Sequence, residues 1–109
     1  MALNSNIGSW VAFNGSGTVA ILASSNVTSI TDNAVGDYTV NWTVAFESVN
    51  YPVAASGKFA ADPGNADVPG IELNQTGAAP EVGSVRLQMI DVSHFNFDCS
   101  YVGVFAAGQ

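Results

Sequence analysis

The chain has 109 residues, enough for one domain with a single core. Of these residues 48% are hydrophobic, so a packed core is expected rather than a disordered chain. Only 10% are charged, and two basic against nine acidic side chains give a net charge of −7. Because nucleic acid and anionic membranes attract clustered lysine and arginine, neither is an expected partner. The one cysteine, Cys99, excludes an intrachain disulfide framework.

The opening residues, 1–6, contain no basic side chain and no apolar block. No secretory signal peptide is visible there, and no segment has the roughly 18 to 20 apolar residues of a membrane helix. We therefore expect the chain to be made and folded in a cytoplasm. A surface this poor in charge suits assembly against other protein copies or exposure outside a cell.

Apolar and polar residues alternate with a period of two, and no long window has the spacing of an amphipathic helix. In the first half of the chain the expected strands are 9–13, 18–23, 27–31 and 37–46. Asn14-Gly15 is a hairpin cue between the first two, although the polar stretch 14–17 also fits a longer loop. Strand 37–46 is the clearest, because one face carries five large apolar side chains: Tyr38, Val40, Trp42, Val44 and Phe46.

The first expected strand has no polar side. Trp10 shares one face with Ala12, and Val11 shares the other with Phe13. A strand that is apolar on both faces is buried on both. We therefore predict that a neighbouring copy of the chain covers one side of this strand.

In the second half we expect strands at 53–60, 71–74 and 84–91, and a loop rich in proline and glycine at Asp62–Gly70. A mainly aromatic stripe then follows at period two, formed by Phe95, Phe97, Cys99 and Tyr101. A last apolar run occupies 102–105. Seven or eight short strands fit a β-sandwich or a small barrel. We predict an all-β fold with a single antiparallel β-sandwich, jelly-roll-like or Ig-like, over 9–109, preceded by an N-terminal arm at 1–8.

The candidate catalytic groups are few. His94 is the only histidine, and no nucleophile motif accompanies it, so a hydrolase ranks far below a binding protein. Asp91 and His94 are three residues apart and would face opposite sides of a regular strand, which disfavours a metal site with Asp98. Cys99 is expected to be a buried, inert thiol. We expect no enzyme activity, no cofactor and no resident metal.

The remaining acidic residues have structural interpretations. Asp62 and Asp67 lie in an acidic loop that could in principle bind calcium. The residue spacing of a calcium-binding loop is absent, however, so we expect these carboxylates to be solvated. Asp32 and Asp37 flank a turn, where aspartate usually accepts hydrogen bonds from backbone N–H groups.

The block 26–41 is distinctive. Four shorter segments accompany it along the chain: 10–15 (Trp-Val-Ala-Phe-Asn-Gly), 17–19 (Gly-Thr-Val), 50–51 (Asn-Tyr) and 102–105 (Val-Gly-Val-Phe). Together they resemble a β-rich surface domain of tailed-phage virion proteins, well over the first half of the chain and loosely over the rest. Ala34-Val35 departs from the family pattern, which has Gly-Thr there. This more apolar turn suggests a contact between subunits.

The resemblance implies a surface module of phage or prophage particles, a kind of domain often found at the ends of tail fibres. We expect a capsid decoration (cement) protein on the virion surface, made in the host bacterial cytoplasm, that binds the major capsid protein as a homotrimer. The alternative is a fibre or tail tip module that binds a host receptor or glycan, with the Asp62–Gly70 loop as its variable tip and aromatic residues as a platform for the glycan. Because a terminus can reach a neighbour, the expected contact residues besides Ala34 and Val35 are Leu3, Ile7 and Trp10.

Overall fold

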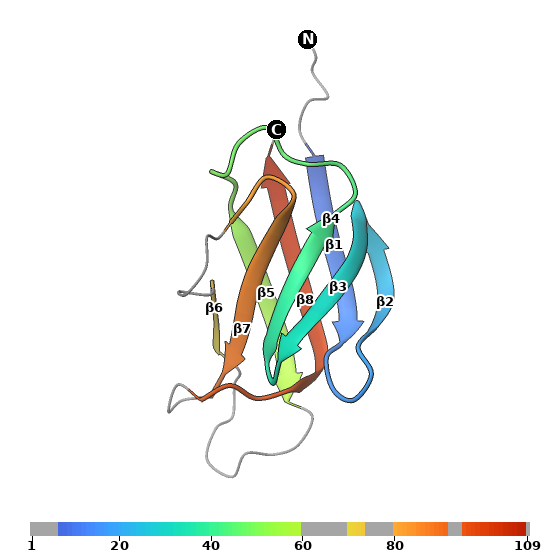
Figure 1. Cartoon of the computed structure of the whole chain (residues 1–109), viewed down its shortest axis with the longest axis vertical. Helices are drawn as coiled ribbons and strands as arrows, with labels where there is room; N and C mark the ends of the chain where they lie inside the picture. The colour runs from blue at the N-terminus through green and yellow to red at the C-terminus, as the bar shows by residue number, and fades with distance from the viewer. Residues whose placement is uncertain (1–6, 60–69, 74–79, 92–94, 109) are drawn as a thin grey trace.

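The computed structural model describes residues 7–59, 70–73, 80–91 and 95–108 (Figure 1). The described residues contain strands and loops but no helix. The eight strands are β1 (Ile7–Asn14), β2 (Ala20–Ser25), β3 (Val27–Ala34), β4 (Asp37–Trp42), β5 (Val53–Phe59), β6 (Gly70–Leu73), β7 (Ser84–Ile90) and β8 (Cys99–Gly108).

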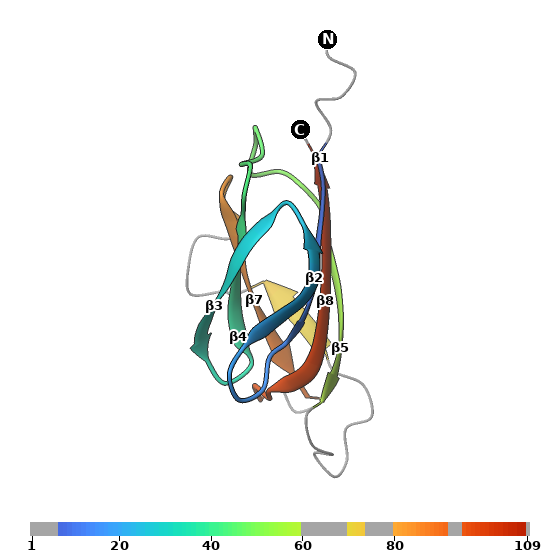
Figure 2. The same cartoon turned by 90° about the vertical axis from the view of Figure 1, so that its right-hand side faces the viewer.

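The strands form two antiparallel sheets of four. The order is β2-β1-β8-β5 in the first sheet and β3-β4-β7-β6 in the second. Figure 2 shows the two sheets edge-on, with β2 and β3 on the side that faces the viewer. The prediction of an all-β, antiparallel sandwich of seven or eight strands is confirmed.

The core lies between the sheets and comes from the expected alternation. On β4, Tyr38, Val40 and Trp42 point inward and are buried, as predicted. Burial of one such large apolar side chain contributes about 1.5 to 3 kcal/mol, so three on one strand are a substantial anchor. The other strands add inward side chains that are equally buried: Val11, Phe13, Val85, Leu87, Met89, Val102, Val104 and Ala106.

Two aromatic groups fill the core. Phe13 and Tyr38 meet edge to face with ring centroids 5.2 Å apart, and the Tyr38 hydroxyl donates to the Gly15 carbonyl at 2.6 Å. In the second group, Phe46 stacks on Tyr51 at 4.1 Å, and Trp42 Nε1 donates to the Tyr51 hydroxyl at 3.0 Å. The buried hydroxyl and indole N–H groups of these side chains are therefore hydrogen-bonded, which offsets most of the free-energy cost of removing them from water.

The clearest expected strand is shorter than predicted. β4 ends at Trp42, and Val44 is exposed, so its predicted place on the apolar face was wrong. The reason is Asn26, between β2 and β3: its backbone carbonyl accepts from Thr43 N–H and its side-chain oxygen from Val44 N–H. These bonds divert the chain out of the sheet. Phe46 still reaches the core, but from a loop.

Other boundaries differ by a few residues. β1 begins at Ile7 rather than 9, and its first residues pair with the end of β8, so positions 7 and 8 belong to the sandwich and not to an arm. The β1–β2 connection is the longer of the two loops considered, with Gly17 at φ 62°. The β3–β4 turn narrows to Val35-Gly36, with Gly36 at φ 64°.

Candidate functional site

The outer surface of the first sheet is apolar and aromatic. The register of β1, β8 and β5 places outward side chains in rows: Trp10–Phe105–Ala54, Ala12–Gly103–Ser56 and Tyr101–Lys58. We call the first seven of these positions (Trp10, Ala12, Ala54, Ser56, Tyr101, Gly103, Phe105) the aromatic face. Lys58 lies at one end of it.

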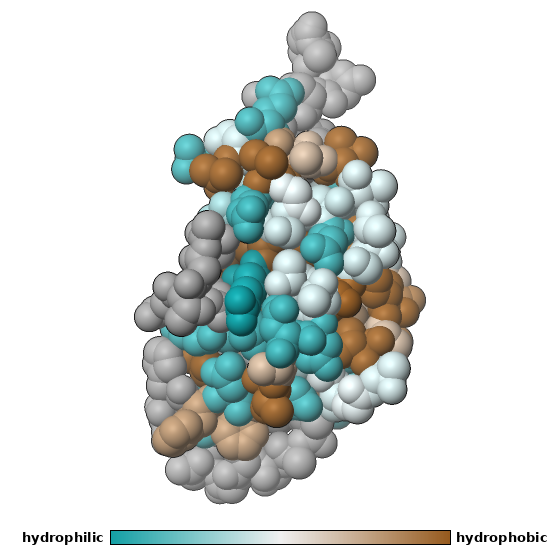
Figure 3. Space-filling model, viewed as in Figure 1, coloured by the Kyte–Doolittle hydropathy of each residue, from teal (hydrophilic) through white to brown (hydrophobic). Residues whose placement is uncertain are grey.

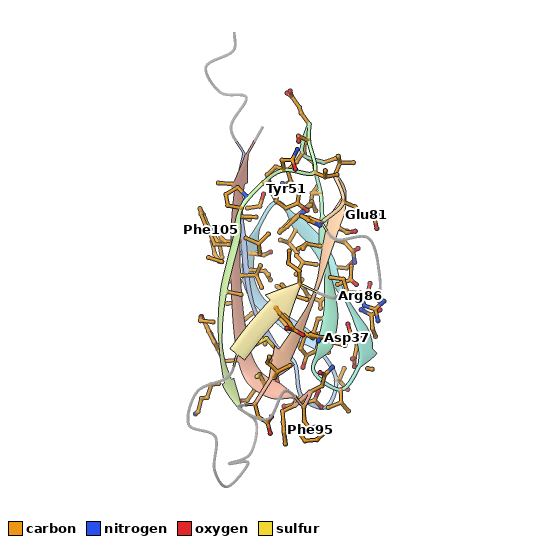
Figure 4. All side chains as sticks on the ribbon, turned by 90° about the vertical axis from the view of Figure 1, so that its left-hand side faces the viewer. Asp37, Tyr51, Glu81, Arg86, Phe95 and Phe105 are labelled. Atoms are coloured by element: carbon orange, nitrogen blue, oxygen red, sulfur yellow. The ribbon has the colours of Figure 1, made fainter. Side chains whose placement is uncertain are left out.

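The three aromatic side chains are far more exposed than the core. Trp10 is 41% exposed, Tyr101 44% and Phe105 51%. Figure 4 shows Phe105 pointing away from the sandwich, on the side opposite Asp37 and Arg86. Burial of exposed aromatic surface is a large part of the energy of protein interfaces, so these side chains are a candidate binding surface.

A shallow hollow of about 410 Å³ lies on this face, between the three aromatic residues. Gly103 is part of its lining: a Cβ there would stand 3.4 Å from Ser56 Oγ and 3.6 Å from the Tyr101 ring. The missing side chain therefore leaves space. The residues that line the hollow and carry polar side-chain atoms are Ser56 and Tyr101, with hydroxyls, and Trp10, with an indole N–H.

A register shift in β8 explains why Tyr101 faces outward. Cys99 pairs with Phe59 and Tyr101 with Lys58, so Ser100 is an extra residue in β8. A bulge of this kind reverses the alternation. Cys99 consequently points into the core while Tyr101 points out, and the expected stripe from Phe95 to Tyr101 does not share one face.

The first sheet is also nearly free of charge. None of the nine acidic residues of the chain falls in β1, β2, β5 or β8, and Lys58 is the one charged residue in these strands. The edge strand β2 is exposed along all six residues and includes Ile21 and Leu22. In Figure 3 a hydrophobic area follows the edge where β2 lies.

The predicted contact residues do not converge. Trp10 lies on the aromatic face, but the expected burial of β1 on both sides is not seen in the single chain, where Trp10 and Ala12 face out. Ala34 and Val35 are exposed at the β3–β4 turn of the other sheet. Ile7 pairs through its backbone with Gly108, and Leu3 lies outside the described residues.

Tyr101 and Phe105 were missed as candidates. The alternation from 101 to 105 around Gly103 was visible in the sequence, but the side that faces out depends on the bulge at Ser100. Period-two patterning shows which residues share a face and not which face is covered.

The candidate catalytic groups have structural partners where they are described. Asp91 Oδ1 accepts from Phe95 N–H at 2.9 Å, and Asp98 Oδ1 accepts from Gly36 N–H at 3.0 Å and from the Tyr38 hydroxyl at 3.2 Å. His94 and most of the Asp62–Gly70 loop, up to 69, lie outside the described residues. Within those residues, no three side chains of the metal-binding types come together.

Cys99 is fully buried and unbridged, as predicted. Burial raises the pKa of its thiol to about 11, with a further contribution from the Asp98 carboxylate. Since the thiolate is the reactive form, this cysteine is a poor nucleophile at neutral pH. Burial, together with Asp98, also raises the pKa of the Tyr38 hydroxyl above its usual range.

Asp37 has a role that the sequence did not indicate. The predicted partners were backbone N–H groups, but Arg86 Nε and Nη2 donate to its two carboxylate oxygens at 2.9 and 2.7 Å. This hydrogen bonding raises the pKa of the Arg86 guanidinium. The pair lies on the outer side of the second sheet, where it ties β4 to β7 (Figure 4).

A comparison with known protein families, with curated proteins and with solved structures found no match. No helix in the described part of the chain is long and apolar enough to cross a membrane. The candidate site therefore depends on geometry alone: an uncharged, aromatic sheet face with a hollow at its centre.

Proposed function

We propose that this chain is a structural protein of a bacteriophage virion, a decoration (cement) protein that binds the outer surface of the assembled capsid as a trimer. The observation that supports a binding role is the aromatic face, whose exposed Trp10, Tyr101 and Phe105 make no ring–ring contact with another aromatic residue in the described part of the chain. The resemblance of block 26–41 to phage surface domains supports the particle as its place of action.

The proposed role is mechanical and not catalytic. A protein that binds only the assembled capsid stabilises it by mass action, by about 2.7 kcal/mol per site at a hundredfold excess over its dissociation constant. A rigid sandwich suits this task because it pays little conformational entropy on binding.

The first experiment is quantitative mass spectrometry of purified particles of the phage or prophage that encodes the chain. A copy number commensurate with the capsid lattice, relative to the major capsid protein, is the expected result. Far fewer copies would move the chain to a fibre, tail or vertex, and absence from particles would overturn the proposal.

The second experiment tests the N-terminal segment. Because the sandwich begins at Ile7, deletion of residues 1–6 leaves every paired backbone group of β1 in place. The truncated chain should fold like the full chain and lose binding to purified capsids in a sedimentation assay. Retained binding would remove Leu3 from the proposed contact.

The hollow over Gly103 favours one alternative, a fibre or tail tip module that binds a neutral glycan. Sugar rings stack on aromatic side chains, and the hydroxyls of Ser56 and Tyr101 would supply hydrogen bonds. Glycan-array binding that is lost in Trp10→Ala would favour this alternative. Because carboxylate and amide side chains are absent from the aromatic face, capsid decoration is the preferred proposal.

A further inference from the structure

We infer that the aromatic face is the contact between copies of this chain, so that its occupant is the same face of a neighbouring copy. This inference deepens the proposed function, on which it rests for the context of an assembled particle. It names the surface through which the copies associate and adds Tyr101 and Phe105 to Trp10 as contact residues.

The first argument is charge. Each copy carries a net charge of −7, so two copies repel one another on approach. The nine acidic residues all lie outside the strands of the first sheet, whereas the second sheet holds Asp32, Asp37 and Glu72 in its strands. Contact through the first sheet therefore brings the fewest like charges together. An uncharged face also fits another uncharged face, which a second copy supplies.

The second argument is shape. Phe105 projects from β8 two residues from Gly103, where the hollow lies. A projecting ring beside a hollow on the same strand lets each copy place its Phe105 over the hollow of a neighbour. In a dimer, each copy places its Phe105 over the hollow of the other. In a closed assembly of three, the Phe105 of each copy lies over the hollow of the next copy. A self-complementary patch gives a two-fold symmetric dimer, whereas a closed ring of three uses a contact between two different parts of each copy's surface.

The third argument is area. Four strands about 4.8 Å apart and some eight residues long cover on the order of 500 Å² in projection, and side-chain relief increases the accessible area. A specific interface buries about 800 Å² per partner. The outer surface of the first sheet is therefore of the order of size that a specific contact between two copies needs.

The test is the mass of the full-length chain in solution, measured by sedimentation velocity over a range of micromolar concentrations. The wild-type chain should form a dimer or trimer. Phe105→Glu should raise the dissociation constant by about 30-fold or more, as expected for a hot-spot residue. Val44→Glu is the matched control, because Val44 is an equally exposed apolar residue (57% against 51%) in a loop, and it should associate like wild type.

A second variant separates loss of contact from loss of fold. Gly103→Ala places a methyl group in the hollow, and the nearest described atom to its Cβ, Ser56 Oγ, lies 3.4 Å away, so the variant should fold normally and still weaken association. Far-ultraviolet circular dichroism confirms the fold of every variant. The emission of Trp10 should shift to shorter wavelength on association, while buried Trp42 gives a constant background.

Two results would overturn the inference. One is a wild-type chain that stays monomeric at every concentration; the other is Phe105→Glu and Val44→Glu behaving alike. Failure of the inference and failure of the decoration role can be told apart. A monomer that still sediments with capsids removes the contact between copies, and the trimer with it, but leaves the decoration role. An oligomer that never binds capsids removes only the decoration role.

Discussion

The outer surfaces of the two sheets differ in what their side chains bind. On the second sheet, outward side chains bind one another: Asn41 Nδ2 donates to Ser29 Oγ at 3.1 Å and to Thr31 Oγ1 at 3.0 Å. Arg86 pairs with Asp37, and Gln88 donates to Glu72. In Figure 3 this surface is mostly hydrophilic or neutral over the strands. These outward polar side chains therefore have hydrogen-bond partners within the chain.

Among the described residues, the aromatic face of the first sheet has no comparable set of side-chain hydrogen bonds. Its large side chains are half exposed, and the cross-strand neighbours Trp10 and Phe105 leave apolar surface in water. Exposed apolar surface of this kind on one side of a domain marks an interaction site. The comparison teaches that the two outer surfaces of one β-sandwich can differ in kind: side chains on one bind each other across strands, and side chains on the other leave apolar surface exposed.

The largest expected effect on stability is that of a substitution at Gly36, in the turn between β3 and β4. In Gly36→Ala, the new Cβ would lie 2.6 Å from the Phe97 carbonyl oxygen, at a backbone φ of 64° that alanine disfavours. We expect a loss of about 4 kcal/mol in the free energy of unfolding, measured in urea. Gly103→Ala on the aromatic face is the contrast and should change stability by less than about 1 kcal/mol. Equal losses would contradict the claim that the aromatic face is dispensable for folding.

Asn26 joins the two sheets and should give the next largest effect. Its φ is 59°, Nδ2 donates to buried Ser9 Oγ at 2.8 Å, and Oδ1 accepts from Val44 N–H at 2.7 Å. Asn26→Ala should cost about 3 kcal/mol, because it loses these bonds and keeps the unfavourable φ. Asn26→Gly relieves the φ and should recover about 1 kcal/mol of that loss in urea unfolding. If the two variants are equally stable, the backbone conformation is not part of the cost.

The fold could be predicted from the sequence because its signals are local. Alternation at 38, 40 and 42 placed these side chains in the core, and the absence of helical spacing excluded helices, both correctly. The predictions that were wrong concern positions whose conformation depends on a residue distant in the sequence. β4 ends at Trp42 because Asn26 takes the next two N–H groups, and nothing near Val44 in the sequence announces this.

The candidate site was predicted only in part, for the same reason. Trp10 is a predicted contact residue because it lies near a terminus that can reach a neighbour, and the structure leaves its side chain 41% exposed on the aromatic face. Tyr101 and Phe105 depend on the bulge at Ser100 and on the pairing of β8 with both β1 and β5. Pairing between strands so far apart in the chain cannot be read from either strand alone.

The inner side of β8 offers a smaller effect that leaves the aromatic face untouched. Burial raises the pKa of Cys99 from 9.0 to about 11, so below pH 9 the thiol is protonated in both folded and unfolded chains. Above pH 9 only the unfolded chain ionises, and stability should fall by on the order of 2 kcal/mol by pH 11. Tyr38 adds to the loss in the same direction. Cys99→Ala should flatten the pH dependence of urea unfolding without changing the association of copies. A slope identical to wild type would mean that Cys99 is not the group that titrates.

The smallest expected effect, and the one that distinguishes the two outer surfaces most directly, is that of salt on association. If copies meet through the aromatic face, no ion pair forms between them, and salt acts only by screening the repulsion between net charges of −7. Association should therefore strengthen a few-fold as sodium chloride rises from low to moderate concentration, as measured by sedimentation velocity. Lys58→Glu, which adds negative charge at the end of the face, should increase this salt dependence. If salt weakens association instead, the copies attract one another through charged groups, and the surface with Asp37 and Arg86 becomes the better candidate for their contact.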